Sequence, residues 1–176
     1  GPFIEKMIQE LVKQSLVEQD GMLWLKPYFA YEQGIARDLL RLMHGKQAIR
    51  SIDTEKAALW VQGQLSIQFA DQQKTAVMQA LTDKVHIITG GPGTGKSTIT
   101  NAILAITCKL TEKITLAAPT GRAAKRMTQI THKMALTIHA LLEMDFASGG
   151  FKRGRDNPLD CDLLIIDEAS MIDTQL

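Results

Sequence analysis

Cysteine, net charge and long apolar runs are all scarce in this sequence, and each shortage excludes a class of protein. The chain has two cysteines among 176 residues, Cys108 and Cys161, without CxxC spacing. We expect both to be reduced packing residues, not part of a disulfide-rich secreted scaffold. The net charge is +1, so a polyanion partner requires a local basic patch. No apolar run approaches the roughly 18 residues of a membrane span, and no stretch is typical of a signal peptide. We therefore expect a cytoplasmic protein without a membrane partner.

The rest of the composition suits a folded protein with two parts. Hydrophobic residues make up 45% of the chain, enough for a packed core. Gly1-Pro2, standing in place of a starting methionine, is typical of a protease-cleavage scar, so we treat residues 1–2 as a tag remnant. We expect a small, mostly helical N-terminal domain over residues 3–62 and an α/β domain over residues 63–176.

Apolar spacing predicts three helices and one hairpin in the N-terminal part. The first helix lies before residue 16, and "LVEQDGMLWL" (16–25) is predicted to be a hairpin with Asp20-Gly21 as its turn. We expect Pro27 to interrupt the chain, a second helix to end near Gly45, and a third to begin at Asp53 as its N-cap. A hairpin with flanking helices is winged-helix-like, although no dense basic recognition helix accompanies it.

The pattern of the second part alternates between helix and strand. Helices are predicted over 71–81, 97–110 and 120–130, and β-branched apolar runs predict buried strands over 84–89, 113–118 and 162–166. Alternation at this spacing is typical of a parallel sheet with helical crossovers. Residues 144–160, rich in glycine and mixed charges, are expected to form a loop or a hairpin.

The stretch "TGGPGTGKSTIT" (89–100) contains the complete P-loop pattern Gly90-x4-Gly95-Lys96-Ser97. Glycines let the backbone curl so that its N–H groups form a nest for phosphate oxygens, at the positive end of the following helix. Lys96 is placed to reach the β- and γ-phosphates, and the Ser97 hydroxyl to bind Mg²⁺. The nucleotide-binding residues predicted here are Gly91, Pro92, Gly93, Thr94, Gly95, Lys96, Ser97 and Thr98. The alternative is a glycine-rich turn with an incidental lysine.

An acidic pair, Asp167 and Glu168, follows the strand predicted in "LLIIDEAS". The carboxyl ends of parallel strands form the ligand crevice of an open sheet, so this pair and the P-loop should meet there. Asp167 is then a candidate to hold Mg²⁺ together with Ser97, and Glu168 is a candidate to orient or deprotonate the attacking water. The alternatives are a helix N-cap for Asp167 and a solvated acid for Glu168.

Three further motifs occur in order around these two, "FADQQKTAVMQAL", "LAAPTGRAAKRM" and "ALTIHALL", and the acidic pair itself stands within "NPLDCDLLIIDEASMID". Together with the P-loop they resemble the superfamily 1 DNA helicases of the RecD type, the exonuclease V alpha-subunit-like proteins. The resemblance is strong over about residues 65–176 and weaker before them. It implies a RecA-like P-loop NTPase fold with a parallel sheet and flanking helices, and an ATP-dependent helicase that moves 5′ to 3′.

The resemblance also implies roles for individual residues. Gln73 matches the glutamine that reads the adenine edge of ATP. The residues implied to contact single-stranded DNA are Pro119, Thr120, Gly121, Arg122, Lys125, Thr137 and His139. Ala140 stands where the family often has a basic residue, which weakens any contact inferred there. Other repair or recombination proteins are possible partners by the same resemblance.

The family works with two motor domains, and the second supplies an arginine finger worth about 10³–10⁵ in rate at related sites. Because the sequence stops at Leu176, we expect an N-terminal fragment, monomeric, that binds ATP weakly and hydrolyses it negligibly. Two other functions fit parts of the sequence. A P-loop NTPase or kinase without a nucleic-acid role leaves the "PTGRAAKRM" and "TIH" stretches unexplained. In the other alternative, residues 3–62 are a non-catalytic DNA- or partner-binding module and the motor half is merely carried along.

Overall fold

The chain forms two compact units in the computed structural model, which describes residues 1–176 apart from 15, 146 and 148 and the side chains of 12–14 and 18. One unit comprises residues 1–44 with 173–176, and the other residues 45–172. These compact units do not test where one domain ends and the next begins. The domain boundary expected near residue 62 therefore stays a prediction. No helix in the described part of the chain is long and apolar enough to cross a membrane.

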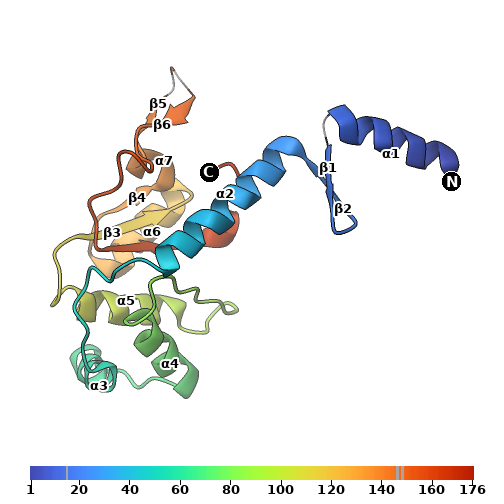
Figure 1. Cartoon of the computed structure of the whole chain (residues 1–176). Coiled ribbons are helices and arrows are strands. Elements are labelled where there is room, and N and C mark those ends of the chain that lie inside the picture. Colours follow the sequence, from blue (N-terminus) through green and yellow to red (C-terminus); the bar gives the residue numbers. More distant parts are fainter. Residues whose placement is uncertain (15, 146, 148) are drawn as a thin grey trace. The chain divides into compact units, whose positions relative to one another are not determined.

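The first unit consists of two helices around a short hairpin (Figure 1). Its elements are α1 (Pro2–Gln14), β1 (Leu16–Gln19), β2 (Met22–Leu25) and α2 (Lys26–Met43). β1 and β2 pair antiparallel, and both turn residues have positive φ, 52° at Asp20 and 75° at Gly21. This confirms the predicted hairpin, since such turns match the twist of the strands. The interruption expected at Pro27 is wrong, because Pro27 lies in the first turn of α2, where its missing N–H has no helical partner to lose.

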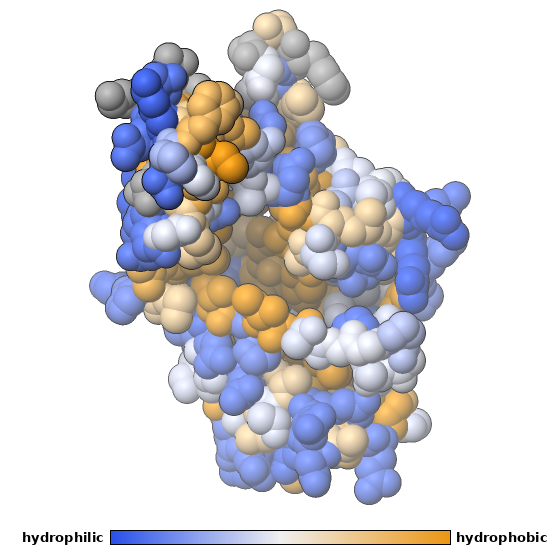
Figure 2. Space-filling model, turned by 90° about the vertical axis from the view of Figure 1, so that its right-hand side faces the viewer, coloured by the Kyte–Doolittle hydropathy of each residue, from blue (hydrophilic) through white to orange (hydrophobic). Residues whose placement is uncertain are grey.

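Few side chains of the first unit are covered. All the buried residues among those whose burial is described fall between Ala58 and Ile138, in the second unit. Apolar side chains of α1 and α2 are instead exposed, for example Phe3 and Leu40 at 75% and 55%. Figure 2 shows apolar side chains reaching the surface of the face it draws, among the polar ones. Burial therefore stabilises this unit little.

The second unit is an α/β structure built on a three-stranded parallel sheet in the order β4-β3-β7. This confirms the predicted fold class, a parallel sheet with flanking helices (Figure 1). Its elements are α3 (Thr54–Leu65), α4 (Asp71–Ala80), α5 (Lys96–Thr107), β3 (Ile114–Ala118), α6 (Gly121–Thr131), β4 (Ala135–Thr137), α7 (Ile138–Leu141), β5 (Met144–Asp145), β6 (Gly150–Phe151), β7 (Leu163–Ile166) and a 3₁₀ turn (Ala169–Met171).

Helix α5 is the centre of the core. Its apolar side chains join Val61 of α3 and Val77 of α4 in one buried cluster, against which Leu163 and Ile165 of β7 also pack. On another side of α5, Leu104 packs with buried residues of β3 and α6. The core thus fixes the helix that follows the P-loop against both the sheet and its neighbouring helices.

Asp53 caps α3 as predicted. Its carboxylate accepts a hydrogen bond of 3.0 Å from the backbone N–H of Lys56, and its Oδ2 lies 3.1 Å from the ammonium of the same residue. The N–H, and secondly the ammonium, hold the pKa of Asp53 below its ordinary value of 3.8. The cap sets where α3 begins, and so which residues of α3 reach the core.

The strand predicted over 84–89 is wrong. This segment begins with a bend at residues 84–85 and joins none of the described sheets, and Ile87 is 82% exposed. Only Ile88 of its β-branched residues packs against the core cluster around α5. β-branched residues favour extended backbone, but a strand also needs a hydrogen-bonding neighbour, and this segment has none in the described structure.

Two short strand elements, β4 and the pair β5–β6, lie where the sequence pattern predicted no specific strand. Residues 144–160, expected as a loop or a hairpin, contain the antiparallel pair β5–β6, with Met144 opposite Phe151. β4 was not predicted, because a three-residue strand is too short for a recognisable apolar pattern.

Both cysteines are free. Burial raises the pKa of the Cys161 thiol, which keeps it protonated at neutral pH, as suits a packing residue.

Candidate nucleotide site and its neighbourhood

The P-loop lies directly before α5, as predicted, and its glycines have the backbone that only glycine adopts easily. Gly93 has φ 74°, and Gly95, the residue before the first turn of α5, has φ 85°. Most side chains cost free energy at such positive φ. The sequence therefore places glycine where the chain turns from the loop into the helix, with the N–H groups of the first turn of α5 facing outward from its end.

Lys96 is bonded within the loop. Its ammonium donates to the carbonyl oxygens of Gly90 at 2.6 Å and Gly91 at 2.8 Å, and the Thr94 hydroxyl donates to the same Gly91 oxygen at 2.9 Å. A phosphate would compete with these carbonyls for the ammonium, and as a charged acceptor it forms the stronger bond. Lys96 is thus held within the loop, next to the backbone that would surround a phosphate.

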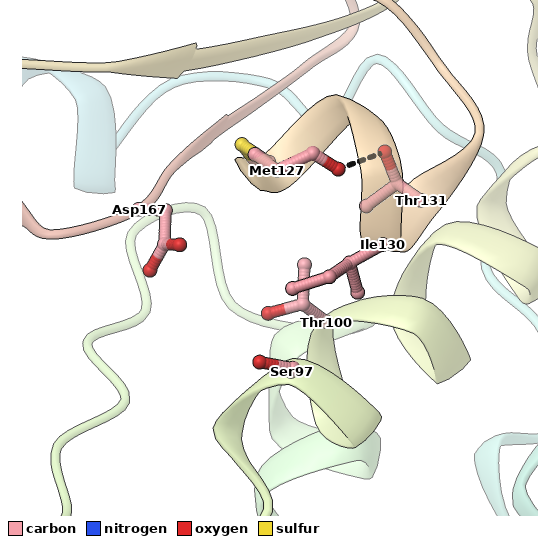
Figure 3. Close-up of a pocket in the computed structure, with 6 residues that line it drawn as sticks. All are labelled: Ser97, Thr100, Met127, Ile130, Thr131 and Asp167. Carbon is pink, nitrogen blue, oxygen red and sulfur yellow. Dashed lines mark hydrogen bonds between the residues drawn. The ribbon is translucent and has the colours of Figure 1, made fainter. Parts of the chain in front are cut away.

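Ser97 and Asp167 line one small pocket, although 70 positions separate them (Figure 3). The pocket measures about 10 Å³, and its other lining residues are Thr100, Met127, Ile130 and Thr131. In Figure 3 the carboxylate of Asp167 and the hydroxyls of Ser97 and Thr100 face the space between α5 and the end of β7. Oxygen donors of this kind are what Mg²⁺ prefers, so the donor set fits the predicted ion.

Thr100 is the member of this pocket that sequence reasoning missed. It lies three residues after Ser97 on α5, a spacing that brings two side chains to the same face of a helix. That spacing was the available signal. Its hydroxyl donates to the carbonyl of Lys96 at 3.0 Å, which ties the side chain to the first turn of the helix.

Asp167 and Glu168 are directed to different partners. The N–H of Asp167 donates to Ala117 in β3 at 3.0 Å, so the sheet fixes its backbone. Its carboxylate accepts from the N–H of Glu168 at 2.9 Å. Glu168 has φ 56°, a strained value for a residue with a side chain, and its carboxylate lies 3.8 Å from the guanidinium of Arg126 on α6.

The residues expected along a DNA strand gather at the same edge of the sheet as Asp167. Pro119 and Thr120 follow β3, and Thr137 ends β4 directly opposite Ala118. Both threonines also have a structural role, since each hydroxyl accepts an N–H at 3.2 Å to cap α6 or α7. Arg122 and Lys125 are exposed on α6, whose opposite face is buried. The structure therefore brings the two predicted DNA motifs together.

His139 is exposed in α7 and its ring centroid lies 5.8 Å from that of Phe151 in β6. Phe151 was not predicted, because nothing in a sequence separation of twelve residues indicates that two rings meet. The ring of His139 is thus packed on one side by an aromatic neighbour.

Gln73 lies beside the P-loop. The side chain, in the first turn of α4, donates from Nε2 to the carbonyl oxygen of Thr94 at 3.0 Å. Of the other residues predicted to bind nucleotide, Gly91 and Pro92 are exposed in the loop and Thr98 is half-buried in α5.

A parallel sheet, a glycine loop that leads into a buried helix, and an aspartate at the end of a neighbouring strand define a P-loop nucleotide-binding domain. A family profile described as an AAA domain matches residues 73–176. The chain therefore belongs to the AAA domain family.

Curated relatives are also similar to this chain, and one of them matches more of it than the family profile does. The chain is 39% identical over 103 residues to the ATP-dependent RecD2 DNA helicase of Deinococcus radiodurans, covering 58% of this chain and 14% of that protein. It is 30% identical over 180 residues to the RecBCD enzyme subunit RecD of Mycobacterium tuberculosis, covering 89% and 30%. It is 36% identical over 108 residues to the ATP-dependent DNA helicase dda of Enterobacteria phage T4, covering 57% and 25%. The chain thus spans less than a third of each, and its RecD-like character is confirmed.

Proposed function

We propose that this chain carries the ATP-binding part of a P-loop DNA helicase of the RecD type. The observation that supports this most is the shared pocket of Ser97 and Asp167. The pocket lies between the start of α5 and the end of β7, which supports a metal–nucleotide site built from both. The names of the similar proteins, two ATP-dependent DNA helicases and the RecBCD enzyme subunit RecD, support this type of motor.

ATP and Mg²⁺ are the ligands of the proposed site. Lys96 exchanges its bonds to Gly90 and Gly91 for bonds to phosphate oxygens, and the loop N–H groups surround those oxygens. Ser97 and Asp167 would hold Mg²⁺, which neutralises phosphate charge when bound. Gln73 has a donor and an acceptor suited to the adenine edge, and it lies against the loop that holds the phosphates.

Glu168 is the proposed group that orients or deprotonates the attacking water. A general base of this kind contributes about 10²–10⁴ in rate. Its ion pair with Arg126 is exposed on both sides, at 40% and 63% of the two side chains. Such a pair holds a carboxylate weakly, so Glu168 is able to turn toward a water in the site.

Single-stranded DNA is the proposed partner of the edge formed by β3 and β4. Arg122 and Lys125 supply exposed charge for phosphates, and the backbone of Thr120-Gly121 adds the N–H groups of a helix N-terminus. Thr137 and His139 lie at the adjacent strand end, and His139 presents a ring on which a base can stack. Phosphate contacts of this type carry no sequence preference.

The activity of the whole protein is also a proposal, since the chain spans only part of its relatives. We infer ATP-driven movement 5′ to 3′ in the cytoplasm, together with other repair or recombination proteins. Residues 1–176 alone are then expected to be a monomer that binds ATP weakly and turns it over negligibly, because a second motor domain supplies the arginine finger in such enzymes.

The test is ATP hydrolysis by the longer helicase protein, measured with and without single-stranded DNA, beside Lys96→Ala. The proposal predicts stimulation by DNA and its loss in Lys96→Ala. Hydrolysis that DNA does not stimulate would contradict the helicase function and leave a P-loop NTPase without a nucleic-acid role. Stimulation that survives Lys96→Ala would contradict the assignment of the site.

A further inference from the structure

Gln73 holds two parts of the chain together through its amide. Its Oε1 accepts from the backbone N–H of Ala70 at 3.1 Å, which caps the start of α4. Its Nε2 donates to the carbonyl oxygen of Thr94 at 3.0 Å, within the P-loop and 21 positions away. One side chain thus links the beginning of α4 to the loop before α5.

The amide is also packed against Gly95. A Cβ placed on Gly95 would lie 2.5 Å from Nε2 of Gln73, below the 3.0 Å that real Cβ contacts essentially never undercut. Gly95 therefore serves two purposes, since its φ of 85° favours glycine and its missing side chain leaves room for Gln73. The hydrogen bond to Thr94 and this contact act on the same peptide group, the one that joins residues 94 and 95.

The orientation of that peptide group decides where one loop N–H points. The peptide bond between Thr94 and Gly95 is trans, like the others in the described part of the chain, so the carbonyl of Thr94 and the N–H of Gly95 point in opposite directions. With the carbonyl held toward Gln73, the N–H of Gly95 is directed away from it. This N–H is one of the donors of the P-loop, immediately before the lysine that reaches the phosphates.

We propose that Gln73 is a positioning residue of the P-loop, which fixes the 94–95 peptide for phosphate binding whatever base the nucleotide carries. The inference rests on the proposed nucleotide site and goes beyond the adenine-reading role implied for this residue. Both roles are compatible, because an amide has two N–H donors and two acceptor lone pairs. The backbone of Ala70 and Thr94 uses one of each, and one of each is left for adenine.

The experiment compares binding of ATP, GTP and tripolyphosphate, each with Mg²⁺, to the chain and to Gln73→Met by titration calorimetry. Methionine has similar length and no donor. The proposal predicts that affinity for all three ligands falls, by about fivefold, the usual worth of one hydrogen bond. Any additional loss confined to ATP measures base reading. Gln72→Met is the matched control, since Gln72 is the exposed neighbour on the same helix, and it should change none of the three.

Hydrogen exchange of the nucleotide-free chain gives a direct readout of the loop. Gln73→Met should speed exchange in peptides covering residues 91–97 and leave those from α6 unchanged. Gln73→Glu separates the loop contact from the cap, because it keeps an acceptor for Ala70 and loses the donor for Thr94. Its added negative charge could itself repel phosphates, so it is compared with the wild type in about 1 M salt, where charges are screened beyond roughly 3 Å. Under these conditions Gln73→Glu should also bind all three ligands more weakly than the wild type does.

The outcomes separate the inference from the proposed function. If the wild-type chain binds none of the ligands, the nucleotide site is wrong and the inference falls with it. If the wild type binds the ligands and both Gln73 variants lose affinity for ATP alone, Gln73 reads only the base and the positioning role is wrong. If the variants lose affinity for all three ligands but the amide hydrogens of α6 also exchange faster, Gln73 supports the whole fold. The specific role in the P-loop is then contradicted as well.

Discussion

Glu168 and Arg126 form an ion pair across 3.8 Å, between Oε1 of the one and Nη1 of the other. The contact joins the end of β7, where hydrolysis is proposed, to α6, which carries the basic residues proposed to contact DNA. Because both side chains are largely exposed, solvent screens the attraction and the pair adds at most about 1 kcal/mol to stability. The pair therefore contributes little to stability, and the Glu168 carboxylate is able to leave Arg126 for a water in the proposed site.

Glu168→Gln tests the proposed water-orienting role. The change keeps the shape of the side chain and removes its ability to take a proton, so hydrolysis by the longer helicase protein should fall by about 10²–10⁴. Binding of ATP should stay within about twofold, since the nest and Lys96 hold the phosphates. Steady-state ATPase and equilibrium binding check both parts. Glu143→Gln, which breaks a pair with Arg153 in a different place, should leave the rate unchanged. An undiminished rate in Glu168→Gln contradicts the role.

Arg122→Ala and Lys125→Ala test the proposed DNA edge. Each should weaken binding of single-stranded DNA without sequence preference and reduce the slope of log affinity against log salt by about 0.7, the value for one phosphate contact on a single strand. Lys113→Ala is the control, because Lys113 precedes β3 at the opposite edge of the sheet and pairs with Asp160. A salt slope that Arg122→Ala and Lys125→Ala leave at the wild-type value would rule out phosphate contacts there.

Gly95→Ala should damage the P-loop through the backbone as well as through Gln73. The residue has φ 85°, where a side chain costs of order 1–3 kcal/mol, and the new Cβ would displace the Gln73 amide. We expect a lower melting temperature and weaker ATP binding. Gly63→Ala is matched to it, since Gly63 lies in α3 with nothing within 4 Å of an added Cβ. It should stabilise the chain by about 0.5–1 kcal/mol. Equal melting temperatures for the two variants would contradict this account of Gly95.

Asp53 should make stability depend on pH in the acid range. Its pKa is lowered in the folded chain from 3.8, so its contribution is fully present well above that value and is lost as the pH falls through the lower folded pKa. The melting temperature of the wild type should therefore fall more steeply below about pH 5 than that of Asp53→Asn, which keeps the capping oxygen without the charge. Thermal unfolding followed by circular dichroism measures this. Parallel curves for the two proteins would show that the cap carries no charge effect.

The local features of the fold were predictable because each depends on neighbouring residues. The Asp20-Gly21 turn, the cap at Asp53 and the P-loop are set within a few positions by backbone preferences and hydrogen bonds. The meeting of Ser97 and Asp167 was also predicted, but for a reason that holds only in part: Asp167 follows a parallel strand, whereas Ser97 is brought there by the packing of α5 against Leu163 and Ile165 of β7. These are the parts in which local chemistry and topology agree.

Features that depend on distant partners were not predictable. The segment 84–89 has the composition of a strand, but pairing is decided by neighbours that the composition does not describe. The bond between Gln73 and Thr94 joins residues 21 positions apart, and the ring contact of His139 with Phe151 depends on how β6 follows α7. Contacts of this kind between distant residues leave no periodic pattern in the sequence from which they could be predicted.

The central claim, that the loop around Lys96 binds the phosphates of ATP, is tested most directly by binding of Mg²⁺-ATP to the wild-type chain and to Lys96→Ala. Removing a charged hydrogen-bond donor should weaken binding by about 10- to 100-fold, with an unchanged melting temperature in the absence of nucleotide. Calorimetric titration gives both affinities. Weak but measurable binding by the wild type that falls in Lys96→Ala is the predicted result, and equal affinities in the two proteins would contradict it.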